Sequence, residues 1–438
     1  MLGNRRDWLR ATLAGVGYLG LRTLATGLPA GFFLDPRRAL AQAPTCSPSA
    51  LQKAQYIIFN TCGSGDPINA NVPGTYDDPG IVHSADPSMA MTPLRMRDQR
   101  SSAAKPWASL PQAVLDRSCF FHLMTNTPVH PKEPDVLKLM NRLSAGEMLP
   151  SALSKLLAPC LGTVQAQPVS VGASTPSEAL SFGGQTLPAI PALALKATLT
   201  SANKAQTNLQ KLRDQTLNQL SELYRNEATP AQRAYIDSLV TSQQQVRGIR
   251  QDLLEQLGSI TDNSADSQVV AALTLIQMKL TPVVAVHIPF GGDNHRDIAL
   301  ADETSQTVSG VATIASLLSQ LGTLGLTDQV TFVSLNVFGR TLGKDSADGR
   351  QHNQNHQASV VIGSGFKGGV IGGLTKLGAD YGALPIDAAT GKGSAMGDIA
   401  AIDSLSSFGK TLLAAIGTDA GTMETLVGNG KVITGALA

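Results

Sequence analysis

The sequence is poor in aromatic residues, in cysteine and in net charge. Phe, Trp and Tyr make up 4% of the 438 residues, and the formal net charge is +1. The chain therefore lacks both the stacking side chains and the basic surface that nucleic-acid-binding proteins use, and we expect no nucleic-acid partner. None of the four cysteines forms a C-x-x-C pair, so their spacing does not predict a thiolate zinc site.

Residues 1–43 have the features of a targeting segment. Arg5-Arg6 is a twin-arginine pair, a weakly apolar run follows it, and Ala41-Gln42-Ala43 is a small-residue cleavage site. A membrane anchor is the alternative, but glycines, Arg22 and Pro29 interrupt the run, and a spanning helix needs about 20 mostly apolar residues. We predict a cleaved signal peptide of the twin-arginine (Tat) export pathway, a periplasmic or secreted location, and no stable membrane span after cleavage.

Cleavage of the signal peptide and export would change the net charge of the chain and the expected state of its cysteines. Without residues 1–43 the chain keeps 28 basic and 31 acidic residues, a net charge of −3. An oxidising compartment permits disulfides, and Cys46, Cys62, Cys119 and Cys160 allow three complete pairings. The sequence does not choose among them.

Short apolar, β-branched runs alternate with helical patterns, which predicts an α/β fold. The runs at 55–60, 118–124, 169–171, 281–288 and 330–335 are typical of buried strands. An amphipathic helix over 301–326 connects the last two, so this βαβ unit predicts a parallel pair. We also predict a helix over 137–157 that Pro150 breaks, a long loop over 67–97, and closing helices over 398–413 and 422–427. The expected architecture is three-layered, with a mostly parallel central sheet.

A change in composition divides the chain. Residues 195–258 are rich in Gln, Leu and paired charges, with leucines at helical spacing, and indicate an antiparallel helical hairpin. A third helix over 266–280 returns to the core. We therefore predict α/β segments at 44–194 and 281–438 and a helical insertion at 195–280. Its charges are typical of a solvated face, while a lid or a protein-docking surface is the functional alternative.

Polar side chains follow several predicted strands, at the position where open α/β sheets place their sites. Asp293 and His295 come after one strand, His352 and His356 after the next, and Asp66 after the first. Mixed Asp and His ligands suit zinc, manganese or a similar divalent ion. In the alternative interpretation the histidines are hydrogen-bonded loop residues and Asp66 belongs to an ordinary glycine turn.

The twin-arginine signal, Gly63-Ser64-Gly65-Asp66, Gly292-Asp293-Asn294-His295, Phe338-Gly339-Arg340-Thr341 and Gly365-Phe366-Lys367-Gly368-Gly369 carry a resemblance. The chain resembles an uncharacterised Tat-exported bacterial family of the alkaline-phosphatase/sulfatase-like superfamily. The resemblance implies an alkaline-phosphatase-like fold and, in the wider superfamily, a two-metal site for phosphoryl or sulfuryl transfer. Val337 and Gln351 stand where the family has acids, which lowers the number of hard oxygen ligands.

These features lead to two hypotheses of different classes. One is an exported, metal-dependent hydrolase that acts on a phosphate or sulfate ester, either a small molecule or a surface polymer. Asp66, Asp293, His295, His352 and His356 are its metal-ligand candidates, and Arg340 is its catalytic candidate, a bidentate clamp for an anionic group. The other is a catalytically degenerate relative that serves as a periplasmic binding or assembly protein and docks through the helical insertion.

Overall fold

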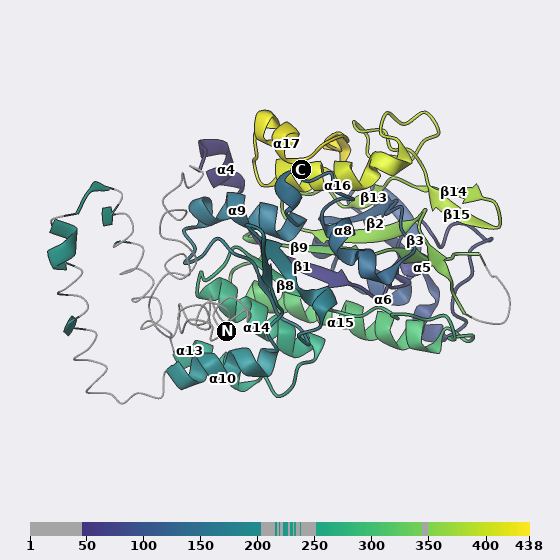
Figure 1. Cartoon of the computed structure of the whole chain (residues 1–438). Coiled ribbons are helices and arrows are strands. Elements are labelled where there is room, and N and C mark those ends of the chain that lie inside the picture. The colour runs from purple at the N-terminus through teal and green to yellow at the C-terminus, as the bar shows by residue number, and fades with distance from the viewer. Residues whose placement is uncertain are drawn as a thin grey trace, which may run out of the picture.

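The computed structural model describes residues 46–202, 251–343 and 349–438, together with some residues between 215 and 237. The predicted signal peptide, most of the predicted helical hairpin and the loop at 344–348 lie outside the described residues. The fold is mixed α/β around one large sheet (Figure 1).

Within the described residues, the central sheet has seven strands in the order β13-β4-β12-β9-β1-β8-β5. Only β12 runs antiparallel to its neighbours, so the prediction of a mostly parallel sheet is confirmed. The bounds are β1 Tyr56–Cys62, β4 Ser118–Leu123, β5 Val169–Ser170, β8 Val283–Val286, β9 Val330–Asn336, β12 Gln357–Ile362 and β13 Gly369–Ile371.

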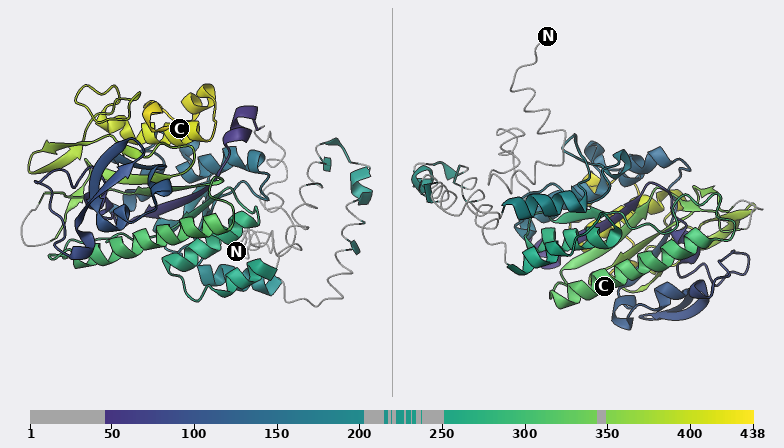
Figure 2. Two further views of the ribbon diagram at one scale, coloured as in Figure 1. Left: turned by 180° about the vertical axis from the view of Figure 1, so that it is seen from behind. Right: turned by 90° about the horizontal axis from the view of Figure 1, so that it is seen from below.

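Helices cover both faces of the sheet, which explains why its strands are apolar without interruption. Alternate residues of β1 enter different cores: Ile58 packs in one cluster, and Ile57 and Phe59 pack in the other. Helices α14 (Ala265–Gln277) and α15 (Ala301–Thr323) lie on one side, and α9 (Leu149–Leu161) and α16 (Ser404–Ala415) lie on the other (Figures 1 and 2). The predicted three layers are visible in this arrangement.

The remaining elements are shorter and surround this framework. The helices are α4 Pro48–Lys53, α5 Ile68–Asn71, α6 Lys105–Ala108, α7 Gln112–Leu115, α8 Glu133–Leu137, α10 Ala192–Ala202, α13 Gln251–Gly258 and α17 Ala420–Leu426. The strands outside the main sheet are β2 Met91–Met96, β3 Gln99–Ala104, β6 Leu180–Phe182, β7 Gln185–Leu187, β10 Gly339–Arg340, β11 His352–Asn353, β14 Leu374–Leu377 and β15 Asp380–Ala383. Helices α10 and α13, which overlap the two ends of the predicted hairpin, contact α14.

Three predictions need correction. The β8-α15-β9 unit is parallel, but its strands do not pair with each other because β1 lies between them and pairs with both. Pro150 begins α9 at its first turn, where its missing N–H costs nothing, and the break lies earlier, after α8. The expected loop over 67–97 contains α5 and the first strand of the β2-β3 hairpin.

A disulfide joins Cys46 to Cys160, across 114 residues of sequence, and Cys62 and Cys119 are free thiols. Within the described ranges, no helix combines the length and apolarity needed to cross a bilayer. Because β12 alone is reversed, the carboxyl ends of β4, β9, β1 and β8 lie at the same edge of the sheet. The loops that follow these four strands carry the candidate site.

Candidate metal centre

Three histidines and one aspartate meet at this edge of the sheet. His130 lies beyond β4, Asp293 and His295 lie beyond β8, and His352 begins β11. One ligand atom from each lies within 4.8 Å of every other. We call these four residues the metal cluster. The structure thus brings together polar residues that the sequence places after different strands.

The distances from the Asp293 carboxylate to the three imidazoles are close to those between ligands of a single ion. The Asp293 Oδ1 atom lies 3.2 Å from His295 Nε2 and 3.8 Å from His352 Nε2, and Asp293 Oδ2 lies 3.5 Å from His130 Nε2. The Nε2 atoms of His295 and His352 are 2.7 Å apart, which is a hydrogen-bond distance. Ligands of a tetrahedral zinc ion, bound at about 2.0–2.1 Å, lie about 3.4 Å from one another.

The hydrogen bonds of the other ring nitrogens determine which nitrogen can bind metal. His130 Nδ1 lies 2.9 Å from the Gly63 carbonyl oxygen, and His352 Nδ1 lies 2.6 Å from that of Pro128. A carbonyl only accepts, so both Nδ1 atoms carry hydrogen and both Nε2 atoms expose a lone pair when the rings are neutral. Arg340 Nη1, which is always a donor, lies 3.4 Å from His295 Nε2. Three lone pairs and a carboxylate therefore converge, and such a set favours a cation.

The ionisation states also suit metal binding. Partial burial raises the pKa of Asp293, but the hydrogen bond and the positive charge of Arg340 outweigh it, so the pKa lies below its usual value. Burial lowers the pKa of His352, and Arg340, His130 and His295 lower it further by charge repulsion. At neutral pH these residues therefore present an ionised carboxylate and a neutral imidazole, the forms that bind metal.

Arg340 lies beside the metal cluster with its side chain fully buried. Its Nη2 atom donates to Asp293 Oδ1 at 2.8 Å and to the Ser64 carbonyl at 2.6 Å, and its Nε atom donates to the Gly65 carbonyl at 2.5 Å. These contacts connect the loop after β1 to Asp293. Arg340 is therefore placed to orient Asp293 in the metal cluster.

Asp66 lies outside the metal cluster, in a buried position. Its Oδ1 atom accepts from the Cys62 thiol at 3.0 Å, and its Oδ2 atom accepts from the Phe290 backbone N–H at 3.2 Å. Burial raises the pKa of Asp66 to about 6, although these hydrogen bonds and the charge of Arg340 oppose the shift. Asp66 therefore connects the first strand to the turn that carries Asp293.

His356 also lies apart from the metal cluster and pairs with His122. Asn69 Nδ2 donates to His356 Nδ1 at 3.1 Å, His356 Nε2 lies 2.8 Å from His122 Nδ1, and His122 Nε2 donates to the Pro73 carbonyl at 2.9 Å. Each neutral ring in this chain gives one hydrogen bond and receives one. Both imidazoles are fully buried, which lowers their pKa values, that of His122 to about 4.

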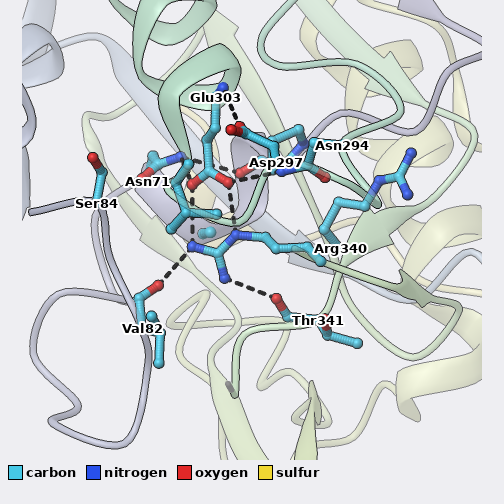
Figure 3. Close-up of polar contacts among 12 residues, drawn as sticks. Asn71, Val82, Ser84, Asn294, Asp297, Glu303, Arg340 and Thr341 are labelled. Atoms are coloured by element: carbon cyan, nitrogen blue, oxygen red, sulfur yellow. Dashed lines mark hydrogen bonds and ion pairs between the residues drawn. The ribbon is translucent and has the colours of Figure 1, made fainter. Parts of the chain in front are cut away.

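A buried ion pair holds together the two loops of the metal cluster (Figure 3). Arg350 Nε donates to Glu303 Oε2 at 2.7 Å, and Arg350 also donates to the carbonyls of Thr341 and Val82. Glu303, in the first turn of α15, accepts a further bond from Asn294 Nδ2 at 3.0 Å. Since Asn294 is adjacent to Asp293 and His295, and Arg350 is two residues before His352, this pair connects both ligand-bearing segments.

A cleft of about 780 Å³ opens beside the metal cluster, and its lining includes His130, Asp293 and the turn Cys62–Ser64. This volume is in the range of small-molecule sites. Val337 is buried in the apolar core and Gln351 is exposed, so neither contributes a carboxylate to the metal cluster.

Of the predicted site residues, Asp293, His295 and His352 come together, Arg340 lies beside them, and Asp66 and His356 serve other contacts. Sequence reasoning did not include His130 among the ligands. The available signal was its position in the polar run after the strand at 118–124, at the same edge as the other loops.

Comparison with protein families gives one match, to a family described as "Protein of unknown function (DUF1501)", over residues 164–387. The matched segment covers just over half of the chain and contains three of the four cluster residues, and His130 precedes it. Comparison with curated proteins gives no match. The chain belongs to the DUF1501 family of proteins of unknown function.

Proposed function

We propose that the protein is an exported, metal-dependent hydrolase of phosphate or sulfate esters, with an alkaline-phosphatase-like arrangement of its sheet. The observation that carries this proposal is the convergence of three imidazole Nε2 atoms and one carboxylate beside a ligand-sized cleft, which His130 and Asp293 help to line. A divalent ion supplies Lewis acidity, which polarises an ester oxygen and makes water a better nucleophile at neutral pH.

The donor set fits a zinc- or manganese-type ion. His130, His295 and His352 offer imidazole nitrogens, which suit zinc and later transition metals better than calcium or magnesium. The backbone carbonyls of Gly63 and Pro128 fix two of the rings from behind, an arrangement that increases ligand basicity. Arg340 would keep Asp293 oriented and ionised.

Two observations support the proposed export. The disulfide between Cys46 and Cys160 is typical of proteins that fold in an oxidising compartment. The twin-arginine pair and the Ala41-Gln42-Ala43 site both precede Cys46 in the sequence. A periplasmic or secreted enzyme of this kind would act on a small ester or on a surface polymer.

Ester hydrolysis with defined metal content tests the proposal. The full mature chain, stripped of metal and then loaded with Zn²⁺ or Mn²⁺, is assayed with p-nitrophenyl phosphate and p-nitrophenyl sulfate. We expect p-nitrophenol release that requires the ion and is lost in His295→Ala. The proposal would be contradicted by equal p-nitrophenol release from the metal-free protein. It would also be contradicted if the metal-loaded protein released p-nitrophenol from neither substrate.

One observation favours the second candidate, a periplasmic binding or assembly protein. Four protein ligands fill a tetrahedral shell, as in structural zinc sites, whereas catalytic zinc sites keep one position open. In this case the chain binds one ion tightly and hydrolyses neither ester, and the helical region that begins with α10 serves for docking. The same assay, combined with metal analysis, separates the two candidates.

A further inference from the structure

The cleft beside the metal cluster has an uneven charge distribution. Among the described residues that line it there is no lysine or arginine, whereas Glu178 and Asp293 both contribute carboxylates. Arg340 is buried behind the cleft, with Asp293 as its acidic partner. Apart from an ion in the metal cluster, the cleft therefore offers no strong partner for an anion.

The walls of the cleft are rigid and largely apolar. Pro131 and Pro134 lie on one segment, Pro176 on a second, and Ile288 and Pro289 follow β8. Proline rings lose no side-chain freedom when a ligand packs on them. Such walls suit an alkyl or ring group more than a second charged group.

Glu178 is held in place at the wall formed by the short helix Pro176–Glu178. Its side chain reaches back to the Thr175 backbone N–H at 3.3 Å and forms a capping box with that residue. Glu178 also lies beside His287. A Cβ atom added at Gly172 would stand 2.5 Å from Glu178 Oε2 and 2.6 Å from His287 Cδ2, so the two side chains are neighbours.

His287 does not neutralise Glu178. Its Nε2 atom bonds to Ser170 Oγ at 3.0 Å and its Nδ1 atom lies 3.1 Å from Thr61 Oγ1. Burial lowers the pKa of His287 despite the opposing charge of Glu178, so the ring is neutral at pH 7. The carboxylate of Glu178 therefore lines the cleft without a lysine or arginine among the described residues beside it.

We infer that the cleft takes the uncharged or cationic organic part of a phosphate- or sulfate-bearing ligand, and that Glu178 excludes ligands with a second anionic group. The inference rests on the proposed function in one respect, because it assigns the anionic head of the ligand to an ion in the metal cluster.

Three phosphonates of equal chain length test this specificity without any turnover: propylphosphonate, 3-aminopropylphosphonate and 3-phosphonopropionate. Binding to the zinc-loaded full mature chain is measured by calorimetry. We expect the neutral and aminated compounds to bind at least about tenfold more tightly than the carboxylated one. Equal or tighter binding of 3-phosphonopropionate, or no binding of any of the three, would overturn the inference.

Two variants assign the effect to Glu178. In Glu178→Gln the preference against 3-phosphonopropionate should fall to within about twofold, because the repelling charge is gone. Asp328→Asn removes an exposed carboxylate that pairs with Arg117 and should leave the order unchanged. An unchanged order in a folded Glu178→Gln protein would overturn the role of Glu178. If the phosphonates bind in the expected order but no ester is hydrolysed, the hydrolase proposal fails and the ligand class stands.

Discussion

The metal cluster and the His122–His356 pair both bring imidazole rings together, yet they differ in three physical respects. In the metal cluster the rings are partly exposed, a carboxylate lies among them, and two rings turn their Nδ1–H groups away toward backbone carbonyls. In the pair the rings are fully buried and stacked at 5.1 Å, and every ring nitrogen has a donor or acceptor of its own.

The difference indicates that the direction of hydrogen bonds, more than the proximity of histidines, distinguishes a candidate metal site. In the pair, each lone pair already receives a hydrogen, so no position remains for an ion. In the metal cluster, the fixed Nδ1–H groups leave the Nε2 lone pairs of His130 and His352 on the side of Asp293, and His295 Nε2, which Arg340 Nη1 contacts, lies at the same point. A cation would stabilise the arrangement in the metal cluster, and the His122–His356 pair offers it no position.

The largest expected effect concerns metal affinity. Structural zinc sites bind with about 10–16 kcal/mol, or about 3 kcal/mol per ligand when divided among four. The double variant His295→Ala/His352→Ala should therefore weaken Zn²⁺ binding by about ten-thousandfold, measured by competition with a chromophoric chelator. Metal content that survives both substitutions would show that the ligands are assigned wrongly.

The buried pair Glu303–Arg350 should be the next most sensitive feature. Glu303→Gln leaves the guanidinium of Arg350 buried without its counter-charge, and the free energy of unfolding should fall by about 3–5 kcal/mol in urea titrations. Zn²⁺ affinity should also fall, by about 10–100-fold, because the pair supports both ligand loops.

The exposed pair Arg117–Asp328 provides the control for this variant. Asp328→Asn should change the free energy of unfolding by less than about 1 kcal/mol and leave Zn²⁺ affinity intact. If Glu303→Gln behaves like Asp328→Asn, the buried pair does not hold the loops.

The two groups of histidines should also differ in their response to pH. His122 has a pKa of about 4 in the folded protein because it is buried, against about 6.5 when unfolded. As pH falls from 6.5 to 4, His122 takes up a proton in the unfolded chain but not in the folded protein. It should therefore lower the free energy of unfolding by about 1.4 kcal/mol per pH unit in this range, and it should have no such effect above pH 6.5. Urea denaturation of metal-free protein and of His122→Leu at pH 7, 6 and 5 measures the difference. Equal pH slopes would contradict burial of a neutral His122.

The smallest expected effect is the loss of one histidine from the buried series of hydrogen bonds that runs from Asn69 through His356 and His122 to Pro73. His356→Leu leaves Asn69 and His122 each without one hydrogen-bond partner, which should reduce the free energy of unfolding by about 1–3 kcal/mol. Zn²⁺ affinity should change by less than about tenfold, a difference of about 1.4 kcal/mol. A loss of affinity as large as in His295→Ala/His352→Ala would place His356 among the ligands after all.

The fold was predictable where local patterns determine it. The strands at 55–60, 118–124 and 330–335 are continuous apolar runs. Strands that helices cover on both faces of a sheet have this pattern, so the local sequence alone predicts them. The insertion of β1 between β8 and β9 was not predictable, since nothing in a βαβ segment shows which distant strand separates its ends. The start of α9 at Pro150 was misread because proline both breaks and begins helices.

The site was predictable to the level of its two main loops. Asp293, His295 and His352 follow strands whose carboxyl ends meet, so topology alone brings them together. His356 precedes β12, the one reversed strand, and enters the interior beside His122. Asp66 has the sequence context of a ligand, and only the structure shows that the Cys62 thiol and the Phe290 N–H occupy its oxygens.

Metal analysis of the full mature protein, purified without chelators, tests the central claim most directly. We predict one transition-metal ion per chain by mass spectrometry of the metal content, and a melting temperature that falls when a chelator removes the ion. No stoichiometric metal, together with the same melting temperature with and without chelator, would contradict the metal centre.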